Sequence, residues 1–463
     1  MADLASLSRE ELIEIIATQQ RMIENQQRQI AELRAEIEQL RRGGKRQAAP
    51  FSKGKRGENP KPPGRKPGQG PFTRRTGRLE EATETIVAPV PVCCPHCGGN
   101  LELEGEEVAT TTELPIHPRP VITAYRVSVC RCRRCGKAVR GSAPGLASDQ
   151  TGATAHRVGP GVMAAAHRLH YAIGIPVRKV PAVLKELTGV SLTQGAITQD
   201  AMRRAEGVVG AIYQDLREQA RKAPVVHTDD TGWRIGGRGA FLMGFDTDQA
   251  TVYQIRDRHR NEEVREIIPA DYPGVLVTDR GKSYDAAGLA GVAQQKCLAH
   301  LLRNASEVLA EKRGPARRFA VKLKGLLREG LSLWHARGTL RGDQFQRRSR
   351  QLEQQLTVHL RHRILRDDDN QMLLDGIGLQ HDRGHILRFL KIEGVEPTNN
   401  RAERILRPAV IARKVSHCSK NQRGADAFVA FVSIAQTARK QARQTIAQAL
   451  RDAFVRSALA PAR

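Results

Sequence analysis

Apolar residues near the N-terminus recur at a strict seven-residue spacing, and a second track runs four positions ahead of the first. Ile on one track with Leu on the other is typical of a parallel two-stranded coiled coil. Strict spacing favours this over a single amphipathic helix, whose stripe would drift. We expect a coiled coil over residues 8–42 that pairs two copies of the chain; a lone helix docked on the protein's own core is the alternative. The tracks are Ile16, Ile23, Ile30 and Ile37, and Leu12, Gln19, Gln26, Leu33 and Leu40.

Between residues 150 and 220 the apolar positions follow a helical period. Within this region Val180–Ile197 is similar to a helix-turn-helix. Gly189 would form the turn, and Ser191 or Thr193 would cap the second helix. The pattern predicts either a DNA-reading element or a helical support domain.

From residue 221 the pattern changes to short apolar runs bounded by turn residues, which is typical of strands. A charged helical stretch at 261–268 interrupts them, so residues 221–302 and 390–425 together predict a mixed α/β sheet. Residues 303–389 show Arg-rich helical patterns and predict an all-helical insertion, and 426–463 predict a C-terminal helical region. The expected strands are 225–229, 240–245, 251–255, 274–279 and 293–297.

Charge adds information about partners. The 463 residues predict a multidomain chain, and 75 Lys and Arg against 49 Asp and Glu give a net charge of +26. This excess indicates a polyanion such as DNA and argues against extracellular glycan or small-metabolite binding. The sequence has no apolar run of about 18 residues to cross a membrane. Its first 20 residues carry acids where a signal peptide is apolar. We expect a soluble cytoplasmic protein that associates with the nucleoid.

Residues 43–80 are rich in Lys, Arg, Pro and Gly and predict an extended basic linker. Such an arm can neutralise phosphates or lie in a DNA groove; a solubilising spacer is the alternative.

Two Cys-x-x-Cys pairs follow within residues 85–145. Each pair can hold one face of a tetrahedral ion, so they predict a structural Zn²⁺ in a zinc-ribbon-like unit. Most of the strands of this unit are expected between Val108 and Val129. Reduced free thiols are the alternative, and Cys93, His96 and Cys130 leave the ligand register open by one place. The predicted ligands are Cys94, Cys97, Cys132 and Cys135.

Two acids close strands of the predicted sheet, and a third follows on a helix. Asp229 and Asp279 end the first and fourth expected strands, and ligands bind at such strand ends in α/β folds. Glu403 follows much later in the chain. Three carboxylates supply the oxygen ligands that Mg²⁺ or Mn²⁺ prefers. Two such ions about 4 Å apart can promote phosphodiester cleavage, which in a basic chain predicts DNA cleavage and joining. Asp230 is the alternative to Asp229, because side chains alternate along a strand.

The other two acids also have structural interpretations. Asp279 could cap the turn before Gly281. Glu403 could form a capping box with Asn400, or an ion pair with Arg407 one turn further on.

Several segments of the chain resemble transposases of the insertion sequence 66 family. The resemblance covers residues from about 12 to 454, including the heptads, the basic linker and the paired cysteines. Its most specific part is Asn-Asn-Arg-Ala-Glu-Arg at 399–404. The motif segments are Thr228–Thr231, Val277–Tyr284, Cys297–Arg303 and Thr398–Lys414.

The resemblance implies a ribonuclease H-like catalytic domain in which Asp229, Asp279 and Glu403 form a DDE triad with two Mg²⁺ (or Mn²⁺) ions. The family has Asp-Glu-Thr where this chain has Asp-Asp-Thr at 229–231, which keeps the first Asp. Pro408 lies within the expected final helix and is predicted to kink or end it.

We therefore expect a cut-and-join DNA transposase, in which hydrolysis at an element end frees a 3′-OH that attacks target DNA. By resemblance His300 belongs to a motif near the site, and a helix-capping or packing role is its alternative. Expected partners are element ends, target DNA, a second copy of the chain and small accessory proteins of the element. An inactive transposase-derived DNA-binding regulator and a ribonuclease H-like nuclease without strand transfer are the alternatives. The predicted DNA contacts are Arg303, Arg404, Arg407, Arg413 and Lys414.

Overall fold

The chain divides into two compact units, residues 1–119 and 120–463, and each is described by itself. The predicted linker at 43–80 lies outside the described residues. The computed structural model describes residues 8–9, 16–20, 22–27, 29–30, 85–86, 97–100, 120–141, 158–361, 364–441 and 446–459.

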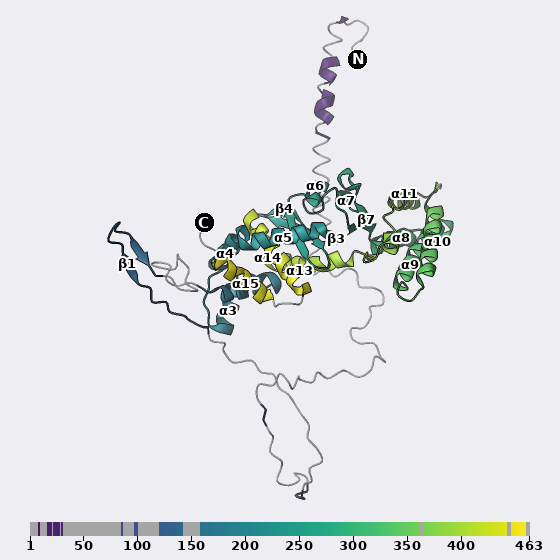
Figure 1. Ribbon diagram of the computed structural model, residues 1–463. Coiled ribbons are helices and arrows are strands. Elements are labelled where there is room, and N and C mark those ends of the chain that lie inside the picture. Colours follow the sequence, from purple (N-terminus) through teal and green to yellow (C-terminus); the bar gives the residue numbers. More distant parts are fainter. Residues whose placement is uncertain are drawn as a thin grey trace. The chain divides into compact units, whose positions relative to one another are not determined.

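The first unit is helical where the heptad pattern predicts a helix. Described residues between 16 and 30 are helical, drawn in purple in Figure 1. Ile16, Ile23 and Ile30 are 58%, 51% and 50% exposed, so this row is available to a partner helix. Pairing with a second copy stays a prediction. The remaining apolar heptad positions lie outside the described residues: Leu12, Leu33, Ile37 and Leu40.

A five-stranded mixed sheet lies at the centre of the second unit, in the order β5-β4-β3-β6-β7. β3, β4 and β5 are antiparallel neighbours, whereas β6 runs parallel to β3 and β7 parallel to β6. Gly236 and Gly237 form the two-residue turn between β3 and β4, with φ of 56° and 84°. The strands are β3 (Val225–Ile235), β4 (Arg238–Asp246), β5 (Thr251–Arg256), β6 (Val275–Thr278) and β7 (Ala293–Lys296).

All five strands fall where the sequence predicts strands, but β3 continues to Ile235 instead of ending at Asp229. Apolar alternation stops at Asp229, while pairing with β4 continues as far as Ile235↔Arg238. The parallel pairing of β3 with β6 ends earlier, at His227↔Val277. β3 and β6 therefore part just before Asp229 and Asp279.

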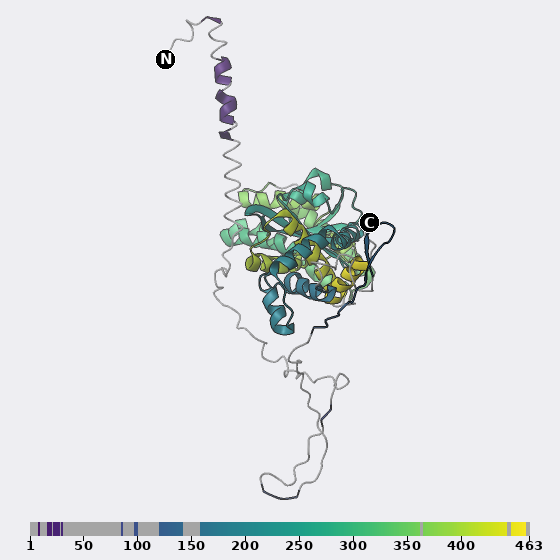
Figure 2. The ribbon, with the colours of Figure 1, turned by 90° about the vertical axis from the view of Figure 1, so that its left-hand side faces the viewer.

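The larger hydrophobic core joins several helices to β4 and β5. The helix α14 lies against β5, where Ser433 Oγ accepts the Tyr253 N–H at 2.9 Å and Thr437 Oγ1 accepts the Thr251 N–H at 3.0 Å. The Tyr213 hydroxyl of α5 donates to the carbonyl of the same residue, Tyr253. Figures 1 and 2 show these helices gathered around the sheet. They are α2 (Pro160–His167), α4 (Gln194–Glu206), α5 (Val208–Lys222), α14 (Gln422–Gln441) and α15 (Ile446–Leu459), with a π-helical turn at Arg168–Ala172. The helix α3 (Val180–Thr188) belongs to a separate small core with Ala166 and Ile197.

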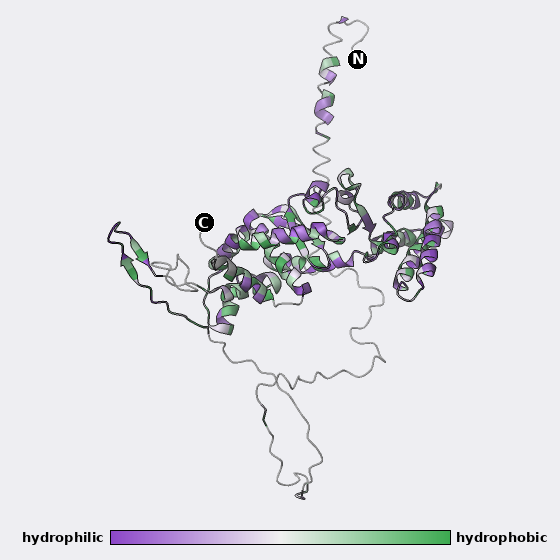
Figure 3. Ribbon diagram, viewed as in Figure 1, coloured by the Kyte–Doolittle hydropathy of each residue, from purple (hydrophilic) through white to green (hydrophobic). Residues whose placement is uncertain are grey.

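The stretch predicted as a helical insertion is helical. Among the described residues of 303–389 there is no strand, and a second apolar core joins these helices to Val275 and Val277 of β6. Figure 3 shows the hydrophilic character of α10 in this group. Its helices are α8 (Leu298–Glu311), α9 (Arg318–His335), α10 (Gly342–Leu360), α11 (Asp368–Asp382) and α12 (Arg388–Lys391), with a 3-10 turn at Gly314–Arg317.

Shorter elements connect the strands of the sheet. The predicted helix at 261–268 is observed as α6, which ends at Arg265, and a second short helix follows Asp279. These elements are α6 (Asn261–Arg265), α7 (Lys282–Asp285) and a 3-10 turn at Ala287–Leu289.

The predicted helix-turn-helix region forms two helices with the expected turn. α3 ends at Gly189, whose φ is 72°, and the Thr193 hydroxyl accepts the Ala196 N–H at the start of α4. Thr193 rather than Ser191 is therefore the cap. DNA reading by this region stays a prediction.

The second cysteine pair lies on a hairpin. β1 (Val129–Arg131) and β2 (Ala138–Arg140) are antiparallel, with Cys130 opposite Val139. The sequence prediction of strands between Val108 and Val129 is wrong for residues 120–128, which have no regular secondary structure. That stretch lacks strand partners among the described residues, and β propensity alone does not form a ladder.

Pro408 does not end its helix. α13 runs without interruption from Asn400 to Ser416 with Pro408 inside it, so the prediction of a helix end there is wrong. Proline removes one N–H bond of the helix, but Leu406 and Ala409 on either side are buried against the core. Tertiary packing outweighs the local cost.

Candidate functional site

β3, β6 and α13 each bring one predicted acid to the same edge of the sheet. Asp229 lies in β3, Asp279 directly follows β6, and Glu403 lies in the first turn of α13. Burial, together with the nearby charges of Asp279, Asp230 and Glu403, raises the pKa of the Asp229 carboxyl to about 7. The three acids are therefore close neighbours, although they are far apart in sequence.

These acids form no direct ion pair with a lysine or arginine of the described residues, although the charges of Arg280 and Lys296 act on Asp279. Among the described residues, none of the three carboxylates forms an ion pair with Lys or Arg, and Glu403 Oε1 lies 4.0 Å from Nε2 of His300. This is unusual in a chain of net charge +26. The negative charge of the cluster is thus not balanced by a direct ion pair with Lys or Arg among the described residues.

The chemistry of the donor set fits a hard divalent cation. Three carboxylates offer only oxygen ligands, and a cation between them removes the repulsion that raises the pKa of Asp229. Within the part of the chain that the structure describes, no three His, Cys, Asp or Glu side chains already converge closely enough to enclose an ion. Shared coordination therefore requires the carboxylates to draw closer together.

Asp230 has a different partner from Asp229. Its Oδ1 lies 3.1 Å from Nδ1 of His259, and Nε2 of His259 lies 3.3 Å from Ser283 Oγ. These contacts link β3 to α7, the helix that follows Asp279. Asp230 thus contacts a histidine, whereas Asp229 forms no ion pair among the described residues.

Asp279 also caps its turn, as its structural interpretation predicts. Its Oδ1 accepts the Gly281 N–H at 2.8 Å. A Cβ on residue 281 would lie 2.9 Å from that oxygen, which explains the glycine. The bond fixes the orientation of the carboxylate without neutralising it.

Glu403 does not form either of the local contacts that its sequence context allows. The N-cap of α13 is Asn399 without a side-chain cap bond, so the capping box with Asn400 is absent. Among the described residues, Glu403 and Arg407 form no ion pair. The carboxylate is left to the cluster with Asp229 and Asp279.

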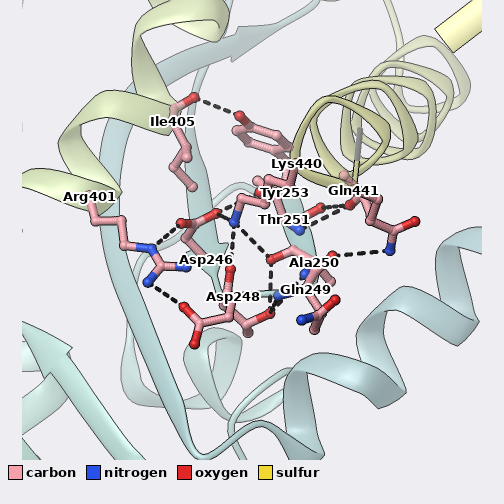
Figure 4. Close-up of polar contacts among 12 residues, drawn as sticks. Asp246, Asp248, Gln249, Ala250, Thr251, Tyr253, Arg401, Ile405, Lys440 and Gln441 are labelled. Atoms are coloured by element: carbon pink, nitrogen blue, oxygen red, sulfur yellow. Dashed lines mark hydrogen bonds and ion pairs between the residues drawn. The ribbon is translucent and has the colours of Figure 1, made fainter. Parts of the chain in front are cut away.

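A buried polar cluster holds the first turn of α13 against the β4–β5 turn (Figure 4). Asp246, at the end of β4, is 1% exposed and accepts from Arg401 Nε at 2.8 Å. It also accepts from Lys440 of α14 and from the Thr251 hydroxyl. Arg401 lies two residues before Glu403, so the cluster restricts where that carboxylate can lie.

Other polar residues around the acids escaped sequence reasoning. Tyr284 is 1% exposed, and burial together with the charges of Asp230 and Asp279 raises its pKa well above the usual value. Lys296 is fully buried, with Nζ 2.9 Å from Asp285 Oδ1. Lys296 could have been singled out from the sequence, because a lysine within an expected buried strand is unusual. His259 lies outside every motif, and no signal in the sequence points to it.

The predicted DNA contacts fall into two groups. Arg303, Arg404, Arg407 and Lys414 are exposed and have no hydrogen-bond or ion-pair partner among the described residues. Arg413 differs, because its guanidinium donates to the Thr231 hydroxyl and the Gly232 carbonyl of β3.

The hairpin turn presents two of the four predicted zinc ligands. Backbone N–H groups of Cys135 and Arg134 lower the pKa of the Cys132 thiol, which favours the thiolate that binds metal. Cys97 and Cys135 are exposed free thiols, and Cys94 lies outside the described residues. Thiolates are ligands that Zn²⁺ prefers, and a Zn²⁺ at these cysteines stays a prediction.

A mixed sheet with carboxylates gathered where two strands end, within a strongly basic chain, is compatible with an enzyme that acts on polynucleotide phosphodiesters. No helix among the described residues is long and apolar enough to cross a membrane. The model of the transposase IS66 family matches residues 156–427, more than half of the chain, and the chain belongs to that family. This match confirms the resemblance seen in the sequence. A search of curated proteins finds no match to the chain.

Proposed function

We propose that this transposase cleaves DNA at the ends of its element and joins the freed strand to target DNA, with Asp229, Asp279 and Glu403 as its catalytic carboxylates. The observation that carries the proposal is their meeting where β3 and β6 part, without Lys or Arg partners among the described residues. The sheet order supports a ribonuclease H-like architecture, because three antiparallel strands are followed by two parallel ones.

In this proposal the three carboxylates hold two Mg²⁺ or Mn²⁺ ions. Such ions lower the pKa of the attacking hydroxyl and stabilise the leaving oxygen. The carboxylates fix where positive charge is placed, and their neutralisation lets an anionic DNA strand approach. Asp279 is already oriented by the Gly281 N–H, and Glu403 is restricted by the anchored first turn of α13.

The two reactions balance without an external energy source. In cleavage, a water oxygen bonds to phosphorus, the bond to the 3′ oxygen breaks, and that oxygen takes up a proton, leaving a 3′-OH and a 5′-phosphate. In joining, the 3′-OH attacks a target phosphodiester and loses its proton, while the target's 3′ oxygen leaves and takes one up. The protein contributes orientation of the two strands at one site.

A basic stripe on α13 supports the placement of DNA. Arg404, Arg407 and Lys414 follow one another at spacings that place them on one helix face, directly after Glu403. All three are exposed and unpartnered among the described residues, and Arg303 of α8 is exposed as well. These side chains would hold backbone phosphates and carry no base specificity. Arg413 is a structural residue in this proposal.

The remaining parts of the chain would organise the complex. The heptad helix would pair two copies and so two element ends, which supports a homodimer or higher assembly. Cys94, Cys97, Cys132 and Cys135 would hold a structural Zn²⁺, and helices α3 and α4 would contact terminal sequences. Small accessory proteins of the element are further proposed partners, and association with the nucleoid would follow from DNA binding.

The test uses Glu403→Gln and Asp279→Asn in the full-length chain. Each removes a ligand charge worth several kcal/mol in the transition state, so cleavage of end DNA falls about a thousandfold or more. Binding of the same DNA in a gel-shift assay stays within about twofold. Full strand transfer by either variant contradicts the triad assignment. A second test distinguishes a transposase from the two alternatives. Wild-type protein is incubated with precut element ends that carry a 3′-OH and with a target plasmid. Only a transposase joins the ends to the plasmid, whereas a nuclease or an inactive regulator does not.

A further inference from the structure

The residue before α13 connects the backbone segments that carry all three acids. Asn399 is 1% exposed and precedes Asn400, the first residue of the helix. An asparagine at this position commonly bonds the N–H groups of its own helix. Here no such bond forms, and Asn399 Nδ2 donates instead to the Thr228 carbonyl of β3 at 2.7 Å. The amide therefore joins α13 to the residue before Asp229.

A second series of bonds leads from Asn399 to Asp279. The Asn399 N–H donates to Cys297 Sγ at 3.1 Å, and the Cys297 N–H donates to the Thr278 carbonyl at 2.8 Å. Thr278 is the last residue of β6 and precedes Asp279. A buried cysteine and a buried asparagine thus connect the two strand ends at the edge where β6 no longer pairs with β3.

The third acid is joined through the helix itself. The Glu403 N–H donates to the Asn399 carbonyl at 3.2 Å, one helical turn further on. Asn399 forms these bonds with its side-chain amide, its N–H and its carbonyl. Each of these three groups therefore leads to a segment that carries a different one of the three acids.

We propose that Asn399 is a positioning residue, which sets the separation of Asp229, Asp279 and Glu403 and thereby the affinity of the acids for divalent cations. The inference rests on the proposed function of these carboxylates as metal ligands. Residues that orient metal ligands typically change metal affinity ten- to a hundredfold when replaced. Because the carboxylates must draw closer to share an ion, a change in backbone separation acts directly on that affinity.

The experiment compares Asn399→Ala with Asn370→Ala in the full-length protein. Asn370 is a matched control: it is 2% exposed, and its Nδ2 donates to the Ala316 carbonyl at 2.8 Å in the helical insertion. Both variants lose a buried amide bond to a carbonyl, and Asn370→Ala also loses a bond to Asp367 Oδ1, so its thermal midpoint falls at least as far as that of Asn399→Ala. Binding of Mn²⁺ is measured by electron paramagnetic resonance, with Glu403→Gln alongside.

The expected result is a tenfold or larger rise in the Kd for Mn²⁺ in Asn399→Ala and no change in Asn370→Ala. Wild-type affinity in folded Asn399→Ala, or equal weakening in both variants, overturns the proposal. If Glu403→Gln also binds Mn²⁺ as tightly as the wild type, the metal-ligand assignment itself has failed.

A second pair of variants covers the case in which Asn399→Ala does not fold. Cys297→Ser keeps an acceptor for the Asn399 N–H, whereas Cys297→Ala removes it. The proposal expects near wild-type Mn²⁺ affinity in the serine variant and weaker binding in the alanine variant. Equal affinities in the two variants contradict it.

Discussion

Arg413 on α13 donates to the Thr231 hydroxyl on β3 over 3.1 Å, and the same nitrogen reaches the Gly232 carbonyl. From the sequence, Arg413 was expected to contact DNA together with Arg303, Arg404, Arg407 and Lys414. Its contacts instead fasten the C-terminal half of α13 to the extended part of β3. The first half is fastened by Asn399 and Arg401, so Glu403 lies on a helix held at both ends.

Replacing Arg407 by alanine should therefore change DNA binding, whereas replacing Arg413 by alanine should change stability. Arg407→Ala removes an exposed cation, so DNA affinity falls and the slope of log K against log salt decreases by about one, with unchanged stability. Arg413→Ala lowers the free energy of unfolding by about 1–3 kcal/mol, because hydrogen bonds from a charged donor to part-buried acceptors are lost. Urea denaturation and salt-dependent DNA binding measure the two effects. If both variants change the salt dependence of DNA binding and Arg413→Ala loses no stability, the assignment of Arg413 to a structural role is wrong.

The buried Asp246 carboxylate should matter more for stability than an exposed acid. Asp246→Ala leaves Arg401 and Lys440 facing each other without their shared partner. Breaking a buried pair in this way costs about 3–5 kcal/mol. Asp343→Ala is the control, since its ion pair with Arg347 is exposed and worth less than about 1 kcal/mol. Chemical denaturation of both variants checks the prediction, which fails if the two losses are equal.

His385 should make the protein less stable in mild acid. It is 5% exposed, and burial together with the charges of Lys296 and Arg388 lowers its pKa to about 4. Because the folded-state pKa lies below the unfolded value of about 6.5, the unfolded chain binds protons first. Its contribution to stability is complete above about pH 6.5 and is lost as the pH falls toward 4.

The measurement compares unfolding free energies of wild type and His385→Gln at pH 7 and pH 5. His385 accounts for about 2 kcal/mol of the wild-type loss over this interval, so the variant loses that much less. His335→Gln, at an exposed position, serves as the control and should follow the wild type. Identical losses in His385→Gln and wild type would exclude the assignment.

The end of α13 stores backbone strain. His417 and Cys418 adopt positive φ angles of 59° and 69°, a region that favours glycine. His417→Gly should raise the free energy of unfolding by about 0.5–1 kcal/mol, because relief of this strain exceeds the added chain entropy. His335→Gly, in the last turn of α9, should lower it by about 1 kcal/mol. Thermal denaturation of the two variants should give shifts of opposite sign, and a loss in both refutes the interpretation.

Much of the fold could be predicted from local patterns. Apolar runs placed all five strands, and Gly189 marked the turn between α3 and α4, with Ser191 or Thr193 as the cap of α4. The sequence likewise predicted that Asp279 lies at a strand end and that Glu403 lies on a helix. These features depend on residues close in sequence, whose propensities and periodicity act before any tertiary contact forms.

The site needed the tertiary structure, because its arrangement depends on contacts between distant residues. Alternation along β3 could not distinguish Asp229 from Asp230, and only the folded chain shows that Asp230 contacts His259. The extension of β3 came from pairing with β4, and Pro408 was tolerated because α13 packs on the core.

The sequence by itself determined the family, the basic charge and the three acids. Only the folded chain decided that Arg413 fastens α13 to β3 and that Asn399 links Thr228, Cys297 and Glu403. A side chain's bonding partner is set by which backbone groups the sheet leaves unpaired beside it. That depends on strand register and helix packing across more than a hundred residues, which no local pattern contains.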